Sequence, residues 1–115
     1  MKIRTVYFKV NDMAKAVKFW TDFLQMPPVK TFDKYHEWRI QDLNFGLVLN
    51  VMGDEWHGSN CAPVFEFKDE EVTSWIERAK ALGAKVIFNG LEDPELLSFV
   101  MADPWGNEFE ISKFH

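Results

Sequence analysis

The chain opens with alternating polar and apolar residues and then changes to the spacing of a helix. The period of two within residues 2–10 predicts a half-buried strand. From Asp12 to Leu24 apolar residues recur every three or four positions, which predicts an amphipathic helix with Asn11 as its N-cap. Extended stretches separated by polar turns follow at 29–32, 35–41 and 45–51. The first half of the chain therefore predicts a strand, a helix and three further strands.

The second half repeats this order of elements. Residues 63–67 alternate again, Asp69 is placed to cap a helix, and Gly83 stands where a left-handed residue ends it. Three more strands are predicted at 84–88, 96–102 and 107–113, the last two joined by the turn sequence DPWG. The elements recur in order at a spacing near 57 residues. This repeat predicts an α+β fold of two βαβββ modules, with a curled mixed sheet around a cleft and the helices outside.

The length of the chain sets how these modules are organised. A chain of 115 residues, 47% of them hydrophobic, buries one core rather than two independent ones. A single module is too small to be stable alone, so the two must pack together. We therefore predict one domain over 1–115, made of module 1 at 1–53, a polar linker at 54–61 and module 2 at 62–115.

Charge and composition narrow the classes of partner. The chain has 13 Lys and Arg against 18 Asp and Glu, and no basic run is longer than a pair. This balance argues against binding to nucleic acid or to a membrane surface. No stretch approaches the roughly 20 apolar residues of a membrane span, and the N-terminus lacks an apolar signal region, so we expect a cytoplasmic protein. The one cysteine, Cys61, is interpreted as a buried small residue rather than a catalytic thiol.

Two segments resemble motifs of a known superfamily. Residues 9–26, KVNDMAKAVKFWTDFLQM, are similar to the strand and helix that open the vicinal-oxygen-chelate fold, although Trp20 replaces the usual Tyr and Gln25 the usual Gly. Residues 99–111, FVMADPWGNEFEI, match its closing DP-x-GN-x-x-E signature. This superfamily contains glyoxalases, bleomycin-resistance proteins and extradiol dioxygenases. The resemblance covers essentially the whole chain, and it implies the same βαβββ repeat and a two-fold dimer.

The resemblance also implies where a metal would bind. In the metal-dependent relatives, His, Gln and Glu side chains from four strands hold a divalent cation that binds two vicinal oxygens of the substrate. Those positions fall here on Thr5, on Leu47 to Asn50, on Ala62 or Pro63, and on Glu110. Glu110 alone keeps a metal-binding side chain of the expected kind. We therefore expect no cofactor, and Ni, Zn, Mn or Fe only if the chain is an enzyme.

The three histidines do not replace the missing ligands. They are His36, His57 and His115, and each is predicted to lie away from the cleft and to be exposed.

Glu110 has two interpretations. By strand periodicity Glu108 and Ser112 share its face, and Glu66 approaches from the strand at 63–67. In the first interpretation Glu110 holds neighbouring strands together or accepts a hydrogen bond from a ligand. In the second it is a catalytic base. A weak cation site made of these oxygens is a further alternative.

Aromatic residues outside the helical stripes are the other candidates. They are Tyr7, Tyr35, Trp38, Phe45, Trp56 and Trp105. Each either packs in the interior or contacts a planar, apolar or cationic ligand, and for Trp105 a dimer contact is a further alternative. The predicted ligand-binding set is Thr5, Tyr7, Trp38, Phe45, Trp56, Glu66, Trp105, Glu108 and Glu110.

Three functions remain open at this point. The first is metal-free binding of a small apolar or aromatic compound, as the resemblance to bleomycin-resistance proteins implies. The second is a divergent lyase or isomerase that uses Glu110, and the third is a subunit whose cleft serves assembly. So many aromatic residues in a short chain would leave apolar surface, which favours a homodimer.

Overall fold

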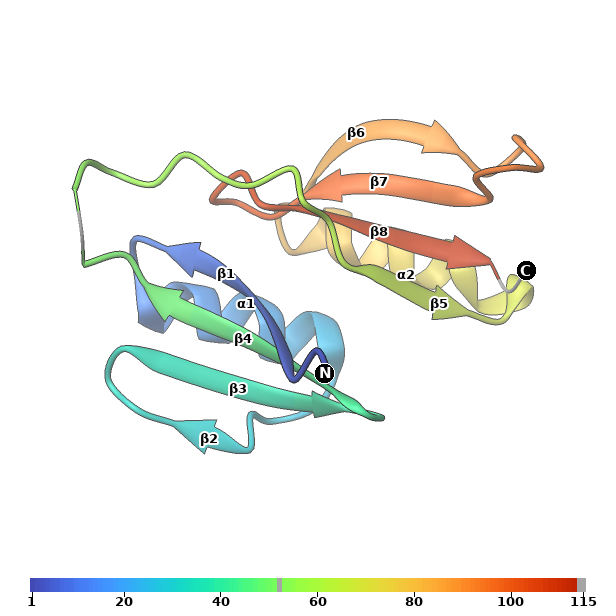
Figure 1. Cartoon of the computed structure of the whole chain (residues 1–115). Helices are drawn as coiled ribbons and strands as arrows, with labels where there is room; N and C mark the ends of the chain where they lie inside the picture. The colour runs from blue at the N-terminus through green and yellow to red at the C-terminus, as the bar shows by residue number, and fades with distance from the viewer. Residues whose placement is uncertain (52, 114–115) are drawn as a thin grey trace. The chain divides into compact units, whose positions relative to one another are not determined.

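The computed structural model describes residues 1–51 and 53–113, and it divides into two compact units, 1–58 and 59–115 (Figure 1). The boundary after Gly58 lies within the stretch predicted as a linker. Each unit has the order strand, helix and three strands. The α+β class and the two βαβββ modules are therefore confirmed, and each module forms a four-stranded mixed sheet of its own. The organisation into one domain stays a prediction.

The first unit is a sheet with one helix on one face. Its elements are β1 (Thr5–Val10), α1 (Met13–Leu24), β2 (Lys30–Thr31), β3 (Tyr35–Ile40) and β4 (Leu43–Leu49). The strand order is β1-β4-β3-β2, with β1 parallel to β4 and the other pairs antiparallel. Trp20 and Phe23 on α1 are fully buried, and Trp20 packs on Phe8 and Phe45 with ring centroids 5.7 and 4.8 Å apart. Tilted aromatic contacts of this kind hold the helix on the sheet.

The cap of α1 differs from the sequence prediction. Asp12, not Asn11, is the N-cap, and its Oδ1 accepts a hydrogen bond from the Lys15 backbone N–H at 3.0 Å. The Asn11 side chain instead bonds the main chain of Trp56, donating to its carbonyl at 2.7 Å and accepting from its N–H at 3.0 Å. Asn11 therefore fastens the segment after β4 to the end of β1.

The second unit repeats the arrangement. Its elements are β5 (Val64–Phe67), α2 (Asp69–Ala81), β6 (Lys85–Gly90), β7 (Ser98–Ala102) and β8 (Glu108–Lys113), in the strand order β5-β8-β7-β6. Gly83 ends α2 at φ +103°, as predicted. The predicted cap Asp69 is instead the first helical residue, and Lys68 occupies the cap position without a side-chain hydrogen bond. The acidic first turn of α2 favours this start, because carboxylates stabilise the positive end of a helix. None of the helices in the described chain is long and apolar enough to cross a membrane.

The closing motif of the sequence builds a buried turn. Asp103 is 1% exposed, and its Oδ1 accepts the backbone N–H groups of Trp105 at 3.0 Å and Asn107 at 2.9 Å. The Gly106 N–H donates to the Asp103 carbonyl at 3.0 Å, with Gly106 at φ +84°. The Asp, Gly and Asn of the signature therefore shape the β7–β8 hairpin.

Two predictions of burial are wrong. Cys61 is exposed, because it lies in the extended segment before β5 rather than on a packed face. His36 is half-buried, since strand parity turns it to the α1 side of the first sheet. His57 is exposed as predicted, and His115 lies outside the described residues.

Candidate functional site

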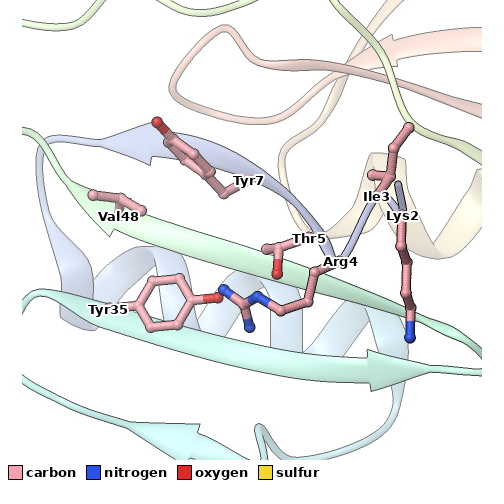
Figure 2. Close-up of a pocket in the computed structure, with 7 residues that line it drawn as sticks. All are labelled: Lys2, Ile3, Arg4, Thr5, Tyr7, Tyr35 and Val48. Carbon is pink, nitrogen blue, oxygen red and sulfur yellow. The ribbon is translucent and has the colours of Figure 1, made fainter.

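The face of the first sheet opposite α1 carries a pocket of about 560 Å³ (Figure 2). The strand register places Thr5 and Tyr7 of β1 on this face together with Gly46 of β4 and Glu37 of β3, because directly paired residues share a face. The pocket is lined by Lys2, Ile3, Arg4, Thr5, Tyr7, Tyr35 and Val48. Backbone alternation therefore gathers residues from β1, β3, β4 and the N-terminal segment around one hollow.

Gly46 determines how the Tyr35 ring lies in this pocket. A Cβ atom at Gly46 would stand 2.8 Å from Tyr35 Cε1 and 3.0 Å from its hydroxyl oxygen. Real Cβ atoms do not approach that closely, so the ring packs directly against the glycine main chain. The absence of a side chain at Gly46 thus lets Tyr35 cover the centre of the sheet.

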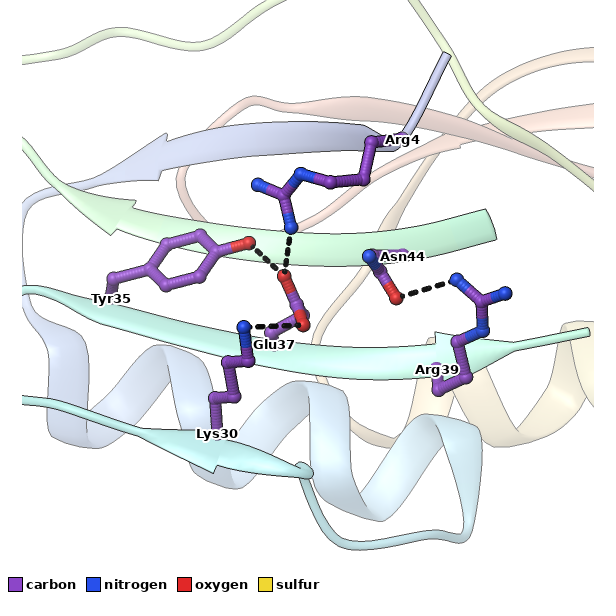
Figure 3. A network of polar contacts seen from close by, with 6 residues as sticks. All are labelled: Arg4, Lys30, Tyr35, Glu37, Arg39 and Asn44. Atoms are coloured by element: carbon purple, nitrogen blue, oxygen red, sulfur yellow. Dashed lines mark hydrogen bonds and ion pairs between the residues drawn. The ribbon is translucent and has the colours of Figure 1, made fainter. Parts of the chain in front are cut away.

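Next to the Tyr35 hydroxyl lies a buried carboxylate with three partners (Figure 3). Glu37 is 3% exposed, and its Oε1 accepts from the Tyr35 hydroxyl at 2.5 Å and from Arg4 Nη1 at 3.2 Å. Lys30 Nζ stands 3.8 Å from the other oxygen, Oε2. A buried charge requires such partners, since an unpaired carboxylate in the interior costs several kcal/mol, of order 3–5. Glu37 thereby fixes the positions of the Tyr35 hydroxyl and the Arg4 guanidinium.

The protonation states follow from these contacts. The Tyr35 hydrogen bond holds the pKa of Glu37 below its ordinary value against the opposing effect of burial, and the charges of Lys30 and Arg4 add to this. Burial raises the pKa of Tyr35, and the bond to Glu37 and its negative charge raise it further. At neutral pH Glu37 is therefore ionised and Tyr35 is a protonated donor. The pair is suited to positioning a ligand rather than to accepting a proton from one.

Replacing Tyr35 by Phe tests this assignment. Tyr35→Phe is expected to lower the free energy of unfolding near neutral pH by about 1–3 kcal/mol, because a buried ionised carboxylate loses a hydrogen bond. The folded-state pKa of Glu37 is depressed, so its stabilising contribution is present above the ordinary pKa and is lost as the pH falls through the folded-state value. The deficit of the variant should therefore shrink from about pH 7 to about pH 3 in urea unfolding. An equal deficit at both ends would show that the hydroxyl does not act through the carboxylate.

Several predicted binding residues lie elsewhere in the first unit. Trp38 and Phe45 are 0% and 2% exposed, because they are paired across β3 and β4 on the α1 side. The Trp38 indole donates to the Met26 carbonyl at 3.0 Å. Both side chains are therefore core residues, and their prediction as ligand-binding residues is corrected here, because strand parity turns them away from the open face. Trp56 is half-buried beside Lys9, whose Nζ lies 5.2 Å from the ring centroid.

The structure brings together residues that sequence reasoning missed. The predicted ligand-binding set lacked Arg4 and Val48, which line the pocket, and Glu37 and Gly46, which contact Tyr35. Thr5 and Tyr7 were in the predicted set, and both line the pocket. A signal for Glu37 existed in the sequence YHEWRI of β3, because its alternation puts Tyr, Glu and Arg on one face and His, Trp and Ile on the other.

The predicted acidic residues gather on the second unit. Glu108, Glu110 and Ser112 occupy the face of β8 opposite the buried Phe109 and Ile111, and Glu66 is paired with Ser112. Glu110 Oε1 accepts from the Ser98 hydroxyl at 2.7 Å. The Ser112 hydroxyl donates to the Leu97 carbonyl at 3.2 Å. Trp105 is half-buried in the β7–β8 turn.

These residues do not fit the metal of the metal-dependent relatives. Among residues 1–51 and 53–113 there is no group of three His, Cys, Asp or Glu side chains that could hold a cation. At the ligand positions of the family, Leu47 is buried in the core, and the Asn50 amide donates to the Asp54 carbonyl at 2.9 Å. Thr5 offers only a hydroxyl, which is a poor ligand for Ni, Zn or Fe.

The comparisons with known proteins match this architecture. A family model described as a glyoxalase-like domain matches residues 5–112. The comparison with curated proteins found no match.

Solved structures share the fold at low sequence identity. A glyoxalase-related enzyme from Fulvimarina pelagi has a TM-score of 0.84 at 17% identity, with 99% of this chain and 88% of that one covered. A glyoxalase/bleomycin resistance protein from Albidiferax ferrireducens has a TM-score of 0.81 at 20% identity, with 97% and 98% covered. The fosfomycin resistance protein FosX from Listeria monocytogenes has a TM-score of 0.79 at 20% identity, with 99% and 91% covered. The family match spans nearly the whole sequence, so this chain belongs to the glyoxalase-like domain family, within the vicinal-oxygen-chelate superfamily that its two motifs resemble.

Proposed function

We propose that this protein binds a small apolar or aromatic compound, without a metal, in the pocket on the open face of the first sheet. The observation that carries the proposal is the pairing of an exposed aromatic ring with a fixed polar wall. Tyr7 is 54% exposed at the pocket, whereas Tyr35 is held by Gly46 and Glu37. Small-molecule sites commonly combine apolar contact surface with a few polar groups of fixed orientation.

The proposal is tested by following backbone amide signals in ¹H–¹⁵N NMR spectra during titration with small aromatic compounds. We expect the shifts to concentrate at Thr5, Tyr7 and Gly46. Tyr7→Ala should weaken the binding, since it removes contact surface at the pocket. Phe32→Ala is the matched control, because Phe32 is 63% exposed and does not line the pocket. Shifts at none of the pocket amides with any compound would contradict the proposal.

The alternative is a lyase or isomerase of the glyoxalase type that uses Glu110. The hydrogen bond from Ser98 favours it, because a carboxylate of fixed orientation on an open sheet face is suited to proton transfer. Metal analysis of the purified protein separates the two proposals. Stoichiometric Ni, Zn, Mn or Fe that is lost in Glu110→Gln would favour the enzyme and contradict metal-free binding.

The homodimer is also part of the proposed function. Apolar side chains stand about half exposed along β6, with Val86 at 50%, Ile87 at 51% and Phe88 at 53%. Water-exposed apolar surface on an edge strand favours association with another chain. We expect light scattering to give twice the mass of the chain, and a monomer at all concentrations would refute the dimer.

A further inference from the structure

We propose that the ligand of this pocket is a small organic anion, with a carboxylate or phosphonate group that binds the Arg4 guanidinium. This inference rests on the proposed function, since it names the chemical class of the compound that the same pocket binds.

The open face of the first sheet has an excess of positive charge. Lys9, Lys30 and Arg39 share it by strand register, and Arg4 reaches it from the segment before β1. Among the strand residues described on this face, Glu37 is the only carboxylate. The chain as a whole has a net charge of −5, so the positive face is a local feature and does not follow from composition. A concave site with one sign of charge concentrates ligands of the opposite sign.

Glu37 does not cancel the charge of Arg4. Its carboxylate also accepts from Tyr35 and faces Lys30, and it is 3% exposed, so a ligand does not meet it directly. The Arg4 side chain is 63% exposed and lines the pocket. Its bond to Glu37 uses Nη1, and a guanidinium carries five N–H donors in a planar fork. Glu37 therefore orients Arg4, while other donors of the fork are available to a planar anion.

The remaining lining suits the body of such a ligand. Tyr7 and Val48 supply apolar surface on the strands next to Arg4 and Tyr35 (Figure 2). A ring resting on Tyr7 would direct an anionic substituent toward Arg4. The pocket volume of about 560 Å³ admits a molecule the size of a substituted benzoate.

Arg39, another positive side chain on this face, contacts a different residue. Arg39 Nη1 donates to Asn44 Oδ1 at 3.0 Å and does not line the pocket. Arg39 therefore has the same charge as Arg4, on the same face, without the proposed contact. This makes it a matched control for general electrostatic attraction.

The test compares ligands of one shape and different charge by calorimetry and by amide shifts. Benzoate and phenylphosphonate carry the two anionic groups, benzamide is the neutral counterpart, and benzylamine is the cation. We expect the better of the two anions to bind about tenfold more tightly than benzamide, because a charge-assisted bidentate contact is about twice as strong as a neutral one. The affinity of the anion should fall as sodium chloride rises from about 50 to about 300 mM.

Two variants then locate the contact. Arg4→Gln is expected to weaken binding of the anion about tenfold and binding of benzamide much less, whereas Arg39→Gln should change the anion affinity less than about twofold. Arg4→Lys keeps the charge and loses the fork, so it should recover only part of the affinity. Thermal unfolding checks that each variant is folded.

The outcomes distinguish a failure of the anion proposal from a failure of the small-molecule site. Equal binding of benzoate and benzamide at the pocket amides would overturn the anion and leave the small-molecule site intact. An equal loss in Arg4→Gln and Arg39→Gln would also overturn it, because general attraction would then explain the preference. The absence of pocket shifts with all four compounds would overturn both.

Discussion

Trp38→Ala is expected to lower the free energy of unfolding by about 3–5 kcal/mol, because it removes a large side chain from the core of the first unit. Trp38 is 0% exposed, its indole donates to the Met26 carbonyl at 3.0 Å, and its ring packs on Phe45 with centroids 6.0 Å apart. The substitution creates a cavity and leaves the Met26 carbonyl without this donor. Urea unfolding followed by circular dichroism measures the loss.

The control for this prediction is Trp56→Ala. Trp56 is half-buried in the segment after β4, and its hydrogen bonds with the Asn11 side chain are made by main-chain atoms that an Ala retains. We expect a loss of roughly 1 kcal/mol, within the range of a partly exposed position. Similar losses for the two variants would mean that Trp38 is not a core residue. A Trp38 variant with full stability and weaker ligand binding would restore it to the predicted binding set.

Gly46→Val is expected to abolish ligand binding in the pocket and to lower the free energy of unfolding by about 1–3 kcal/mol. The new Cβ would stand 2.8 Å from the Tyr35 ring, so the ring must leave its position and its hydrogen bond to Glu37. Equilibrium unfolding and titration with an aromatic ligand measure the two effects.

A double-mutant cycle shows whether the clash with Tyr35 is the cause. In a Tyr35→Ala background the same Gly46→Val change meets no ring, so its cost should fall to near zero. A small gain in stability in the Tyr35→Ala background would agree with the same explanation, because Val has a higher strand propensity than Gly. A cost that persists without the Tyr35 ring would mean that Gly46 is needed for another reason, and the pocket geometry would need revision.

The order of the elements was predictable because the spacing of apolar residues along the chain follows the buried face of each strand or helix. The alternation before Val10 and the helical spacing from Asp12 to Leu24 have a simple physical origin, since one face of each element is packed. Caps were less predictable. Asn11 and Asp12 have the same local preference for an N-cap, and the choice depends on Trp56, which is distant in the sequence. The residues next to Asn11 in the sequence do not reveal a contact with a residue 45 positions away.

The site was less predictable than the fold. The sequence predicts aromatic strand residues as ligand contacts, but their role depends on the face of the sheet on which they lie. Trp38 and Phe45 lie on the inner face and pack in the core. Gly46 has no functional group by which the sequence could mark it as a site residue, although its lack of a side chain lets the Tyr35 ring pack against the sheet. Glu37 was overlooked because its importance arises from Arg4 and Lys30, which reach it from separate segments of the chain. Side-chain identity predicts chemistry only after the register is known.

The two sheets have the same strand order, so their open faces can be compared position by position. When Tyr7 is aligned with Val64, at the repeat spacing of 57 residues, the register aligns Gly46 with Glu110, Glu37 with Val100 and Tyr35 with Ser98. A hydroxyl residue stands at the same position in both units and donates to a carboxylate, which lies on the same strand in the first unit and on the neighbouring strand in the second. The same backbone frame thus orients a carboxylate from either of two strands, so the position of the hydroxyl donor does not by itself fix which strand carries the acid.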